Sequence, residues 1–397
     1  MTSGKDRGRT KAPFRADHVG SLIRPDNLAK ARKVSADRPR SEVVLSPEAL
    51  AELAQIQQAA IRDIVKMQQD VGLKVVTDGE YNRTSWQRDF LLKIENIVDA
   101  PSKISVKFHS AQGVREHAPP TMRVAGKMRR PAGGMFVEDY KFLHGVLSEK
   151  SGAETGSKAT PKVTFPSPTV VHFRGGREMI DAKAYPEMSG FYSDLARVYQ
   201  EEIAGLADAG CRYIQIDEVN LAYLCDPELR KNVTALGEDP ALLPRTYAKL
   251  INDSIAKKPK DMVACMHLCR GNFAGSWVAE GGYEPVAEVL FNEMNIDGYF
   301  LEYDSERAGG FEPLRFLPKG KVAVLGLVTT KSPILESKDD LKRRIEAAAK
   351  FVDIDQLALS PQCGFSSGIG GETMTPDIQK AKLELIVQTA QEVWGSA

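Results

Sequence analysis

The sequence lacks long apolar runs, an excess of charge of either sign, and a dense set of cysteines. No stretch approaches the ~20 consecutive apolar residues of a membrane-spanning helix, and the polar N-terminus has no apolar core of the kind that marks a secretory signal. Basic and acidic side chains number 53 each, so the basic excess that is usual in nucleic-acid-binding proteins is missing. We therefore expect a cytoplasmic protein that binds neither membrane nor nucleic acid.

The remaining composition is typical of a folded globular protein. Apolar residues make up 42% and charged residues 27% of the 397 positions. Five cysteines are too few for a disulfide scaffold in a reducing compartment, so each is expected to be a core residue, a metal ligand or a nucleophile. Residues 1–12 are polar and basic, and we expect them to form a disordered, solvated tail.

Short apolar runs that predict β-strands recur along the rest of the chain. Most are apolar at every position, as expected for parallel strands that are buried on both faces. Eight such strands alternating with helices predict an α/β fold, a single closed (β/α)8 TIM barrel over residues 13–397. An open, doubly wound sheet is the alternative. The predicted strands span residues 16–21, 74–78, 169–173, 212–217, 262–269, 298–303, 322–327 and 356–360.

Helical patterns lie between these runs. Residues 47–71 and 189–209 each place apolar side chains three or four positions apart, and residues 338–351 and 376–394 are further amphipathic segments. The rhythm breaks over about residues 100–165, which are rich in Lys, Pro, Gly and Ser. We interpret this part as an insertion after strand 2, a β-ribbon or long loops near the mouth of the barrel.

Metal-ligating side chains occur at the ends of three predicted strands. His267 and Cys269 stand two positions apart, so both side chains point to one face of their strand. Glu302 ends the next strand, and Cys363 follows the last one. An isolated His-x-Cys is weak evidence of a metal site, but strand ends meet at one rim of a barrel. The four groups together predict a tetrahedral zinc site. The other cysteines are expected to be core residues: Cys211, Cys225 and Cys265.

With these residues in place, the chain resembles the catalytic domain of cobalamin-independent methionine synthase, in particular the short, single-barrel members of this group of zinc-dependent thiol alkyltransferases. The resemblance rests on HVGS (18–21), TDGEYNRTSW (77–86), IQIDEVN (214–220), MHLC (266–269), FLEYDSERAG (300–309) and SPQCG (360–364). It implies a Zn²⁺ cofactor bound by His267, Cys269, Glu302 and Cys363. It also implies contacts with an amino-acid substrate at Gly20, Ser21, Glu80 and Asp217.

The chemistry gives these residues distinct roles. Zinc deprotonates a coordinated thiol, and two thiolates with one carboxylate leave an electron-rich site that keeps the bound sulfur nucleophilic. Glu80 is suited to pair with an ammonium group, and Ser21 to bind a carboxylate; taken alone, Glu80 would be read as a loop ion pair. Asp217 ends a strand at the catalytic rim and is a candidate catalytic residue. His18 and Trp86 are candidate substrate contacts near this rim, where Trp86 is equally suited to stacking on a flat donor or to packing.

The sequence departs from the long members of the resembled family in two respects. Those members carry an additional N-terminal barrel that helps to hold the folate tail, and this chain has no room for one. They also have a His before the Ser-Pro that follows strand 7, where this chain has Lys331 in TTKSP (329–333). Lys331 is therefore the candidate for proton handling here. The departures leave methylfolate, a methylated corrinoid and other activated alkyl compounds open as donors.

Three functional hypotheses follow. The first is a zinc-dependent S-methyltransferase that converts homocysteine to methionine, with homocysteine and a methyl donor as its small-molecule partners. The second keeps the zinc chemistry but changes the thiol or the alkyl donor, as in the opening of an epoxide by a thiol. The third is a non-catalytic barrel with structural zinc. The sequence leaves open the oligomeric state, including a homo-oligomer.

Overall fold

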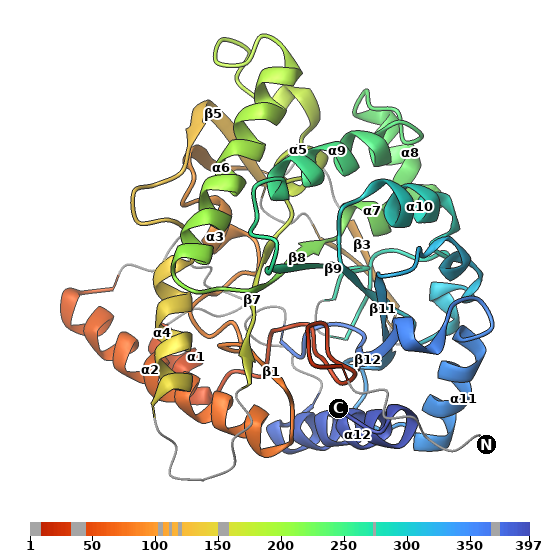
Figure 1. Ribbon diagram of the computed structural model, residues 1–397. Helices are drawn as coiled ribbons and strands as arrows, with labels where there is room; N and C mark the ends of the chain where they lie inside the picture. The colour runs from red at the N-terminus through yellow and green to blue at the C-terminus, as the bar shows by residue number, and fades with distance from the viewer. Residues whose placement is uncertain are drawn as a thin grey trace.

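A six-stranded parallel β-sheet forms the centre of the computed structural model (Figure 1). The structure describes residues 9–32, 45–101, 106–110, 113–117, 121–149, 159–272, 275–366 and 374–397, so part of the predicted tail lies outside the described residues. The strand order is β12-β11-β10-β9-β8-β7. The strands are β7 (Val163–Pro166), β8 (Tyr213–Glu218), β9 (Val263–Leu268), β10 (Gly298–Glu302), β11 (Val322–Val328) and β12 (Leu357–Pro361).

Shorter pairings extend the sheet at both edges. At one edge, β6 (Thr160–Pro161) runs into β7 and pairs in parallel with β1 (Val75–Val76). At the other, Ala16 forms a parallel bridge with Leu359 of β12. The predicted strands at 16–21 and 74–78 are therefore reduced to one bridging residue and two paired residues. The two edges approach each other, because Thr77 Oγ1 donates to Gly20 O at 2.7 Å.

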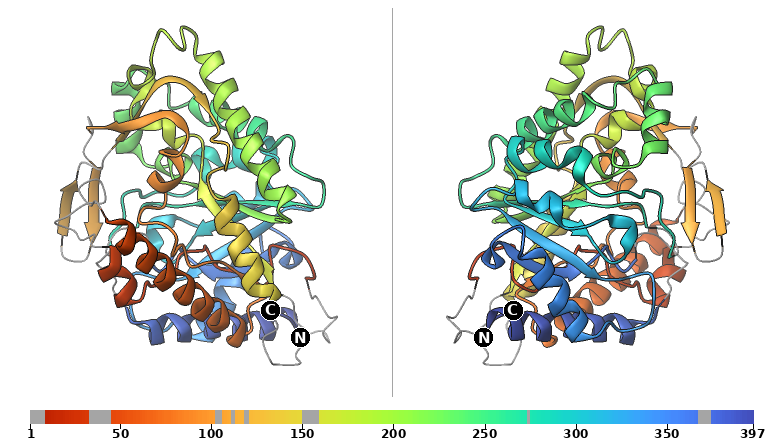
Figure 2. Two further views of the ribbon diagram at one scale, coloured as in Figure 1. Left: turned by 90° about the vertical axis from the view of Figure 1, so that its left-hand side faces the viewer. Right: turned by 90° about the vertical axis from the view of Figure 1, so that its right-hand side faces the viewer.

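Helices surround the sheet (Figures 1 and 2), and their caps account for where several of them begin. Helices α2, α11 and α12 each begin with a side-chain cap that accepts a hydrogen bond from a backbone N–H of the first turn. The caps are Ser46 for α2, Ser337 for α11 and Thr375 for α12, and a proline is the first residue of α2 and of α12. The helices expected from periodicity are confirmed: α2 (Pro47–Asp70), α6 (Met188–Asp208), α11 (Lys338–Ala348) and α12 (Pro376–Trp394). The others are α1 (Asp26–Arg32), α3 (Arg88–Leu91), α4 (Val137–Ser148), α5 (Val170–Phe173), α7 (Asn220–Tyr223), α8 (Pro227–Ala235), α9 (Leu243–Ile255) and α10 (Glu284–Glu288).

One predicted strand is wrong. Residues 169–173 form the short helix α5, and the strand at this position is β7, which lies within the segment interpreted as an insertion. The run TVVHF is apolar and β-branched, but so short a run does not distinguish a strand from a buried helical turn. Pro161 precedes β7 and Pro166 is its last residue, and prolines so close together do not indicate a strand in the sequence.

Two antiparallel strand pairs lie in and beside the segment that we interpreted as a β-ribbon or long loops. β2 (Glu95–Ala100) pairs antiparallel with β5 (Thr121–Arg129), and β3 (Val106–Ser110) pairs antiparallel with β4 (Gly113–His117). The β3–β4 pair stands at the edge of the molecule in Figure 2. His109 of β3 exchanges two backbone hydrogen bonds with Trp277, of 2.7 and 2.9 Å, which ties the ribbon to the loop after β9. The ribbon thus lies against the carboxyl ends of the sheet strands.

The sheet is apolar on both faces. Its outer face packs against the helices in one large cluster, and a smaller cluster that includes Val19, Tyr213, Phe300 and Val324 lies on the other face. A buried ion pair interrupts the smaller cluster, because Lys162 Nζ lies 2.9 Å from Asp17 Oδ1. Among the described helices, none combines the length and the apolar character that crossing a bilayer would require.

Candidate metal centre

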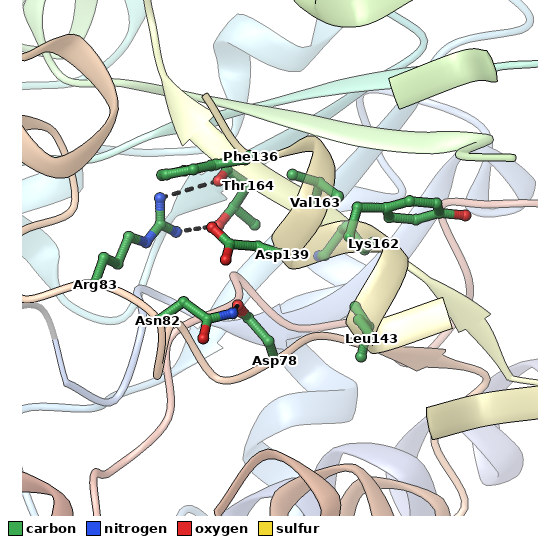
Figure 3. Close-up of a pocket in the computed structure, with 10 residues that line it drawn as sticks. Asp78, Asn82, Arg83, Phe136, Asp139, Leu143, Lys162, Val163 and Thr164 are labelled. Atoms are coloured by element: carbon green, nitrogen blue, oxygen red, sulfur yellow. Dashed lines mark hydrogen bonds between the residues drawn. The ribbon is translucent and has the colours of Figure 1, made fainter. Parts of the chain in front are cut away.

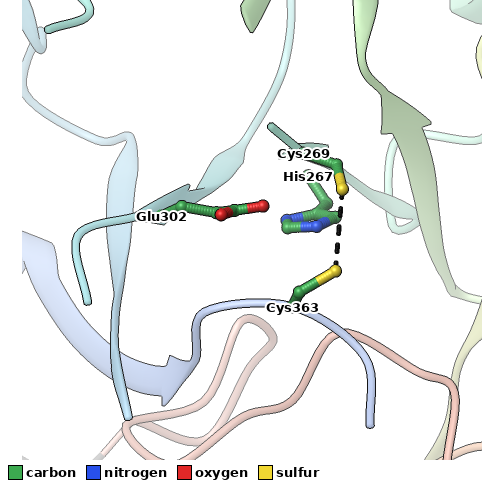
Figure 4. A group of neighbouring side chains, drawn as sticks. All are labelled: His267, Cys269, Glu302 and Cys363. Atoms are coloured by element: carbon green, nitrogen blue, oxygen red, sulfur yellow. Dashed lines mark hydrogen bonds between the residues drawn. The ribbon is translucent and has the colours of Figure 1, made fainter. Parts of the chain in front are cut away.

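The four predicted metal ligands lie together at the carboxyl ends of the strands (Figure 4). Ligand atoms of His267, Cys269, Glu302 and Cys363 are all within 4.8 Å of one another. His267 belongs to β9, Glu302 is the last residue of β10, and Cys363 follows β12. The β9–β10 register pairs Leu268 with Leu301, so Cys269 and Glu302 leave their strands at the same level.

The donor set fits a zinc ion. Nε2 of His267 is buried and has no hydrogen-bond partner among the described residues, while Nδ1 lies 3.4 Å from Phe300 O. A histidine whose other ring nitrogen faces a backbone carbonyl is oriented in the way that metal-binding histidines are. The sulfur atoms of Cys269 and Cys363 are 3.6 Å apart. One imidazole, two thiols and one carboxylate are ligands that zinc takes in tetrahedral sites.

A hydrogen bond joins the two thiols, and either sulfur can be its donor. The hydrogen bond with Cys269 holds the pKa of the Cys363 thiol well below its usual range, although burial opposes this shift. The same hydrogen bond, together with burial, holds the pKa of Cys269 well above its usual range. A bound cation favours both groups as thiolates, so metal binding would release the proton of this hydrogen bond.

Glu302 is held by groups on both of its oxygens. Oε1 accepts a hydrogen bond from the backbone N–H of Arg270 at 2.9 Å, and Oε2 lies 3.0 Å from Arg307 Nη2. Lys331 Nζ lies 3.8 Å from the same Oε2 and 3.9 Å from Asp304 Oδ2. Lys331, the predicted proton-handling residue, thus faces two carboxylates behind the cluster and is not among the residues that line the cavity described next.

A cavity of about 290 Å³ opens onto the cluster. Its lining includes three of the predicted ligands, His267, Cys269 and Cys363. It also includes four of the predicted substrate contacts: Ser21, Glu80, Trp86 and Asp217. Residues from the two ends of the chain and from four strand ends are therefore brought to one site. A metal ion held by these ligands would be accessible from the cavity, unlike the ion of a closed structural site.

The other two predicted substrate contacts lie beneath this lining. Gly20 has φ +136°, and a Cβ there would come within 2.7 Å of Thr164 Cγ2, so the position requires glycine. His18 is buried, and its backbone N–H donates to Asp17 Oδ1 at 2.8 Å while its carbonyl accepts from Lys162. Neither residue is part of the cavity lining. Burial, followed by the nearby Lys162, holds the pKa of His18 well below its usual range.

Glu80 has an unusual backbone conformation and a buried partner that sequence reasoning missed. Its φ is +64°, which is uncommon for a residue with a side chain and frequent at functional sites. Arg83 Nη2 lies 2.7 Å from Glu80 Oε1, and Thr164 Oγ1 donates to the same oxygen at 3.1 Å. Figure 3 shows Arg83 reaching Thr164 as well, and the backbone carbonyl of Thr164 accepts from Nη1 at 3.0 Å. Arg83 thus fixes Glu80 from behind.

The space around Arg83 in Figure 3 is a separate small cavity. It measures about 20 Å³, room for roughly one water molecule, so it is too small for a substrate. Asp78 and Asp139 lie on its wall, and burial, with a smaller contribution from Asp78, raises the pKa of Asp139 to about 6. This small cavity matters for the site only because Arg83, which holds Glu80, lies on its wall.

Asp217 faces the cavity, whereas its neighbour Glu218 faces the other side of β8. Gln215 Nε2 donates to Asp217 Oδ1 at 2.7 Å. Burial, followed by the nearby carboxylate of Glu80, raises the pKa of Asp217 to about 7. Glu218 accepts from Thr169 Oγ1 at 2.6 Å and from the backbone N–H of Asn220 at 2.6 Å, so its role is to hold the start of α7. The carboxylates of Glu80 and Asp217 lie near each other and are together suited to bind a cationic group.

Fold and site together define an α/β protein with a His-Cys-Glu-Cys cluster in a cavity that also carries paired carboxylates. The model of the cobalamin-independent synthase catalytic domain matches residues 33–392, and the chain belongs to this family of methyltransferases, which are in general zinc-dependent. The uncharacterized Bacillus subtilis protein YxjH is 41% identical over 395 residues, covering 98% of this chain and 97% of its own.

Solved structures agree with this assignment. A putative vitamin-B12-independent methionine synthase from Listeria monocytogenes is 34% identical, with a TM-score of 0.73 and coverage of 98% of this chain and 100% of its own. A B12-independent methionine synthase from Shewanella sp. W3-18-1, in complex with selenomethionine, has a TM-score of 0.66 at 20% identity and covers 96% of this chain and 97% of its own. The second likeness concerns the fold alone.

Proposed function

We propose that this protein is a zinc-dependent S-methyltransferase that transfers a methyl group to homocysteine and forms methionine. The observation that carries the proposal is the shared cavity, in which His267, Cys269 and Cys363 lie beside Ser21 and the paired carboxylates of Glu80 and Asp217. Bound at the four ligands, zinc would supply a Lewis acid that keeps the substrate sulfur as a thiolate at neutral pH. The chain's own residues then have to place the amino-acid end and the donor.

The proposal includes a closed (β/α)8 barrel as the scaffold. It is supported by the pairing of β1 with β6 at one edge of the sheet and of Ala16 with Leu359 at the other. Two hydrogen bonds link these edges, from Thr77 Oγ1 to Gly20 O at 2.7 Å and from Leu22 N to Gly79 O at 3.1 Å. A closed barrel gathers the carboxyl ends of all strands at one rim, which is where the cavity lies.

We assign the amino-acid end of homocysteine to Ser21, Glu80 and Asp217. Glu80 and Asp217 lie close enough that the carboxylate of Glu80 contributes to the raised pKa of Asp217. A substrate ammonium between them would relieve this repulsion, so the site is prepared for a cation. The Ser21 hydroxyl is suited to donate to the substrate carboxylate. Arg83 holds Glu80 in place through its 2.7 Å ion pair.

The chemical step moves one methyl group. A new S–C bond forms as the bond between the methyl carbon and the donor breaks, and the donor keeps the electron pair of the broken bond. Methylfolate and a methylated corrinoid both meet this requirement. We place the donor over Trp86, whose ring lines the cavity and offers a stacking surface.

The test is methionine formation from homocysteine with methyltetrahydrofolate or methylcobalamin, using the zinc-loaded protein. Cys363→Ala should abolish turnover, and Cys211→Ala, which changes a buried cysteine outside the cluster, should retain it. Absence of methionine with both donors would remove homocysteine as the acceptor.

An alternative acceptor without an amino-acid end would keep the zinc chemistry and leave Glu80 without a role. The comparison of homocysteine with 4-mercaptobutyrate, which lacks only the ammonium group, decides between the two. A preference for 4-mercaptobutyrate would favour the alternative.

A further inference from the structure

The wall of the cavity that includes Trp86 also carries a half-buried cation, Arg174, that has no counter-ion among the described residues. Arg174 follows α5 and lines the cavity together with Trp86, Phe108 and Tyr223. Among the described residues, its buried Nη1 has no hydrogen-bond partner, and no carboxylate lies within ion-pair distance of its guanidinium. Burial lowers the pKa of Arg174, because it removes the charged guanidinium from water.

Two other arginines near the centre are paired with carboxylates, and the buried guanidinium of Arg270 lies over the Tyr283 ring, 4.4 Å from its centroid. Arg83 pairs with Glu80 at 2.7 Å, and Arg307 pairs with Glu302 at 3.0 Å and with Asp304 at 2.8 Å. Removal of a guanidinium from water is costly unless the cation is paired and hydrogen-bonded. A cation that lines a cavity without such a partner is therefore a candidate for binding an anion from outside the chain.

Arg174 lines the same cavity as the proposed amino-acid subsite but is a different part of its wall. Tyr223 lies near both Arg174 and the cluster: charges on Arg174, Cys269 and Glu302 all act on its hydroxyl, although burial is the main reason that its pKa is raised. Trp86, Phe108 and Phe173 pack with Tyr223 and Cys269 in one apolar group. The amino-acid subsite is instead defined by Ser21, Glu80 and Asp217, which have their own cation in Arg83.

We propose that Arg174 binds an anionic oxygen group, most simply a carboxylate, on the alkyl donor, whose flat apolar part lies against Trp86 and Phe108. This inference rests on the proposed function, because it assigns the second substrate of the same site. The guanidinium offers two parallel N–H donors in the geometry of a carboxylate. It would hold the donor by its anionic end and direct its alkyl group toward Cys269 and the substrate sulfur.

A binding experiment without turnover tests the subsite. The probes are benzoate and benzamide, which share a flat ring and differ in charge, titrated calorimetrically into the zinc-loaded protein and into the chelated protein. Benzoate should bind about tenfold or more tightly than benzamide to both forms, which excludes direct binding to the metal. Arg174→Gln should remove this preference, and Arg174→Lys should keep part of it.

The matched control is Arg343→Gln, which removes an exposed guanidinium far from the cavity lining and should leave both affinities unchanged. Equal affinity of the wild-type protein for the two probes would overturn the proposal, as would an unchanged preference in Arg174→Gln. Circular dichroism and zinc content of each variant show whether it has folded, and Arg174→Lys preserves the charge should Arg174→Gln fail to fold.

A second measurement separates this inference from the proposed function. Arg174→Gln should raise the KM for the methyl donor about 10- to 100-fold, the range for a charge-assisted hydrogen bond, and leave the dissociation constant of homocysteine unchanged. If homocysteine affinity falls and the donor KM does not, Arg174 serves the acceptor and the proposal is wrong while the methyltransferase activity stands. If the benzoate preference depends on Arg174 but no methionine forms, the anion subsite stands and the homocysteine assignment falls.

Discussion

Gly364 is the position at which a single methyl group should damage substrate binding most selectively. It lines the cavity next to Cys363, and a Cβ added there would lie 1.9 Å from Ser21 Oγ and 3.1 Å from Ser21 Cβ. Real Cβ atoms essentially never approach other heavy atoms closer than 3.0 Å, so the Ser21 hydroxyl has to move by roughly 1 Å or more. Gly364→Ala should thus remove the hydroxyl from its place without deleting it.

The expected loss of homocysteine affinity follows from the charge of the substrate carboxylate, the proposed partner of the Ser21 hydroxyl. A hydrogen bond to a charged group contributes about 1.5–3 kcal/mol, which corresponds to about 10- to 100-fold in the dissociation constant of homocysteine. The assay is a calorimetric titration of homocysteine into zinc-loaded protein, with zinc content as a check that the neighbouring Cys363 still binds metal. Gly145→Ala is the matched control, because a Cβ at Gly145 meets nothing within 4 Å.

A double-mutant cycle tests the reasoning itself. Ser21→Ala should cost a similar amount, and Gly364→Ala in the Ser21→Ala background should add little, because the displaced hydroxyl is already gone. Losses that simply add would refute the explanation, since they would mean that the alanine at Gly364 acts through some group other than Ser21.

Four further predictions concern the carboxylates and the metal. Glu80→Gln should weaken homocysteine binding about tenfold or more and leave 4-mercaptobutyrate binding unchanged in the same titration; equal losses would exclude an ammonium contact. Because the pKa of Asp217 is raised to about 7, its proton must leave before it can bind an ammonium group, so the affinity for methionine, which has no thiol, should rise with pH up to about 7 and then level off; a profile that Asp217→Asn does not flatten would contradict this. In the substrate-free protein, the same raised pKa of Asp217 should make the free energy of unfolding decrease as the pH rises from about 4 to about 7. Chelation of zinc should leave a cooperative thermal transition in circular dichroism, because the strands that carry the ligands are packed in large apolar clusters; unfolding on chelation would instead indicate structural zinc.

The grouping of the four candidate metal ligands could be predicted from sequence because its geometry follows from strand periodicity. His267 and Cys269 share a face of one strand, and the ends of parallel strands meet at one level, which brings Glu302 alongside them. The helices at residues 47–71 and 376–394 were predictable for the same local reason, since their apolar side chains recur every three or four positions. These features depend on residues close in the chain or on a regular register.

Features that depend on tertiary contacts were not predictable. Arg83 and Arg174 are isolated arginines in the sequence, and only the structure distinguishes the one that pairs with Glu80 from the one that faces the cavity without a partner. The strand predicted at residues 169–173 failed because Val170 and Val171 are buried whether the segment is a strand or, as observed, the helix α5. Lys331 was singled out as a proton-handling residue by its position after β11, and that role stays a prediction; its contacts with Glu302 and Asp304 required coordinates.

Those contacts bear on how Glu302 could give up its place on a metal ion. The carboxylate of Glu302 contacts three groups that are not metal ligands: the backbone N–H of Arg270 and the side chains of Arg307 and Lys331. These groups could hold the Glu302 carboxylate when a substrate sulfur takes its place on the metal. Arg307→Gln should therefore weaken thiol binding about tenfold and leave zinc affinity equal or higher, measured by competition with a chromogenic chelator. Arg315→Gln, which breaks an exposed pair with Glu284, should change neither quantity. A variant at Arg307 that loses zinc but binds thiol normally would show instead that the arginine supports the carboxylate in its metal-bound position.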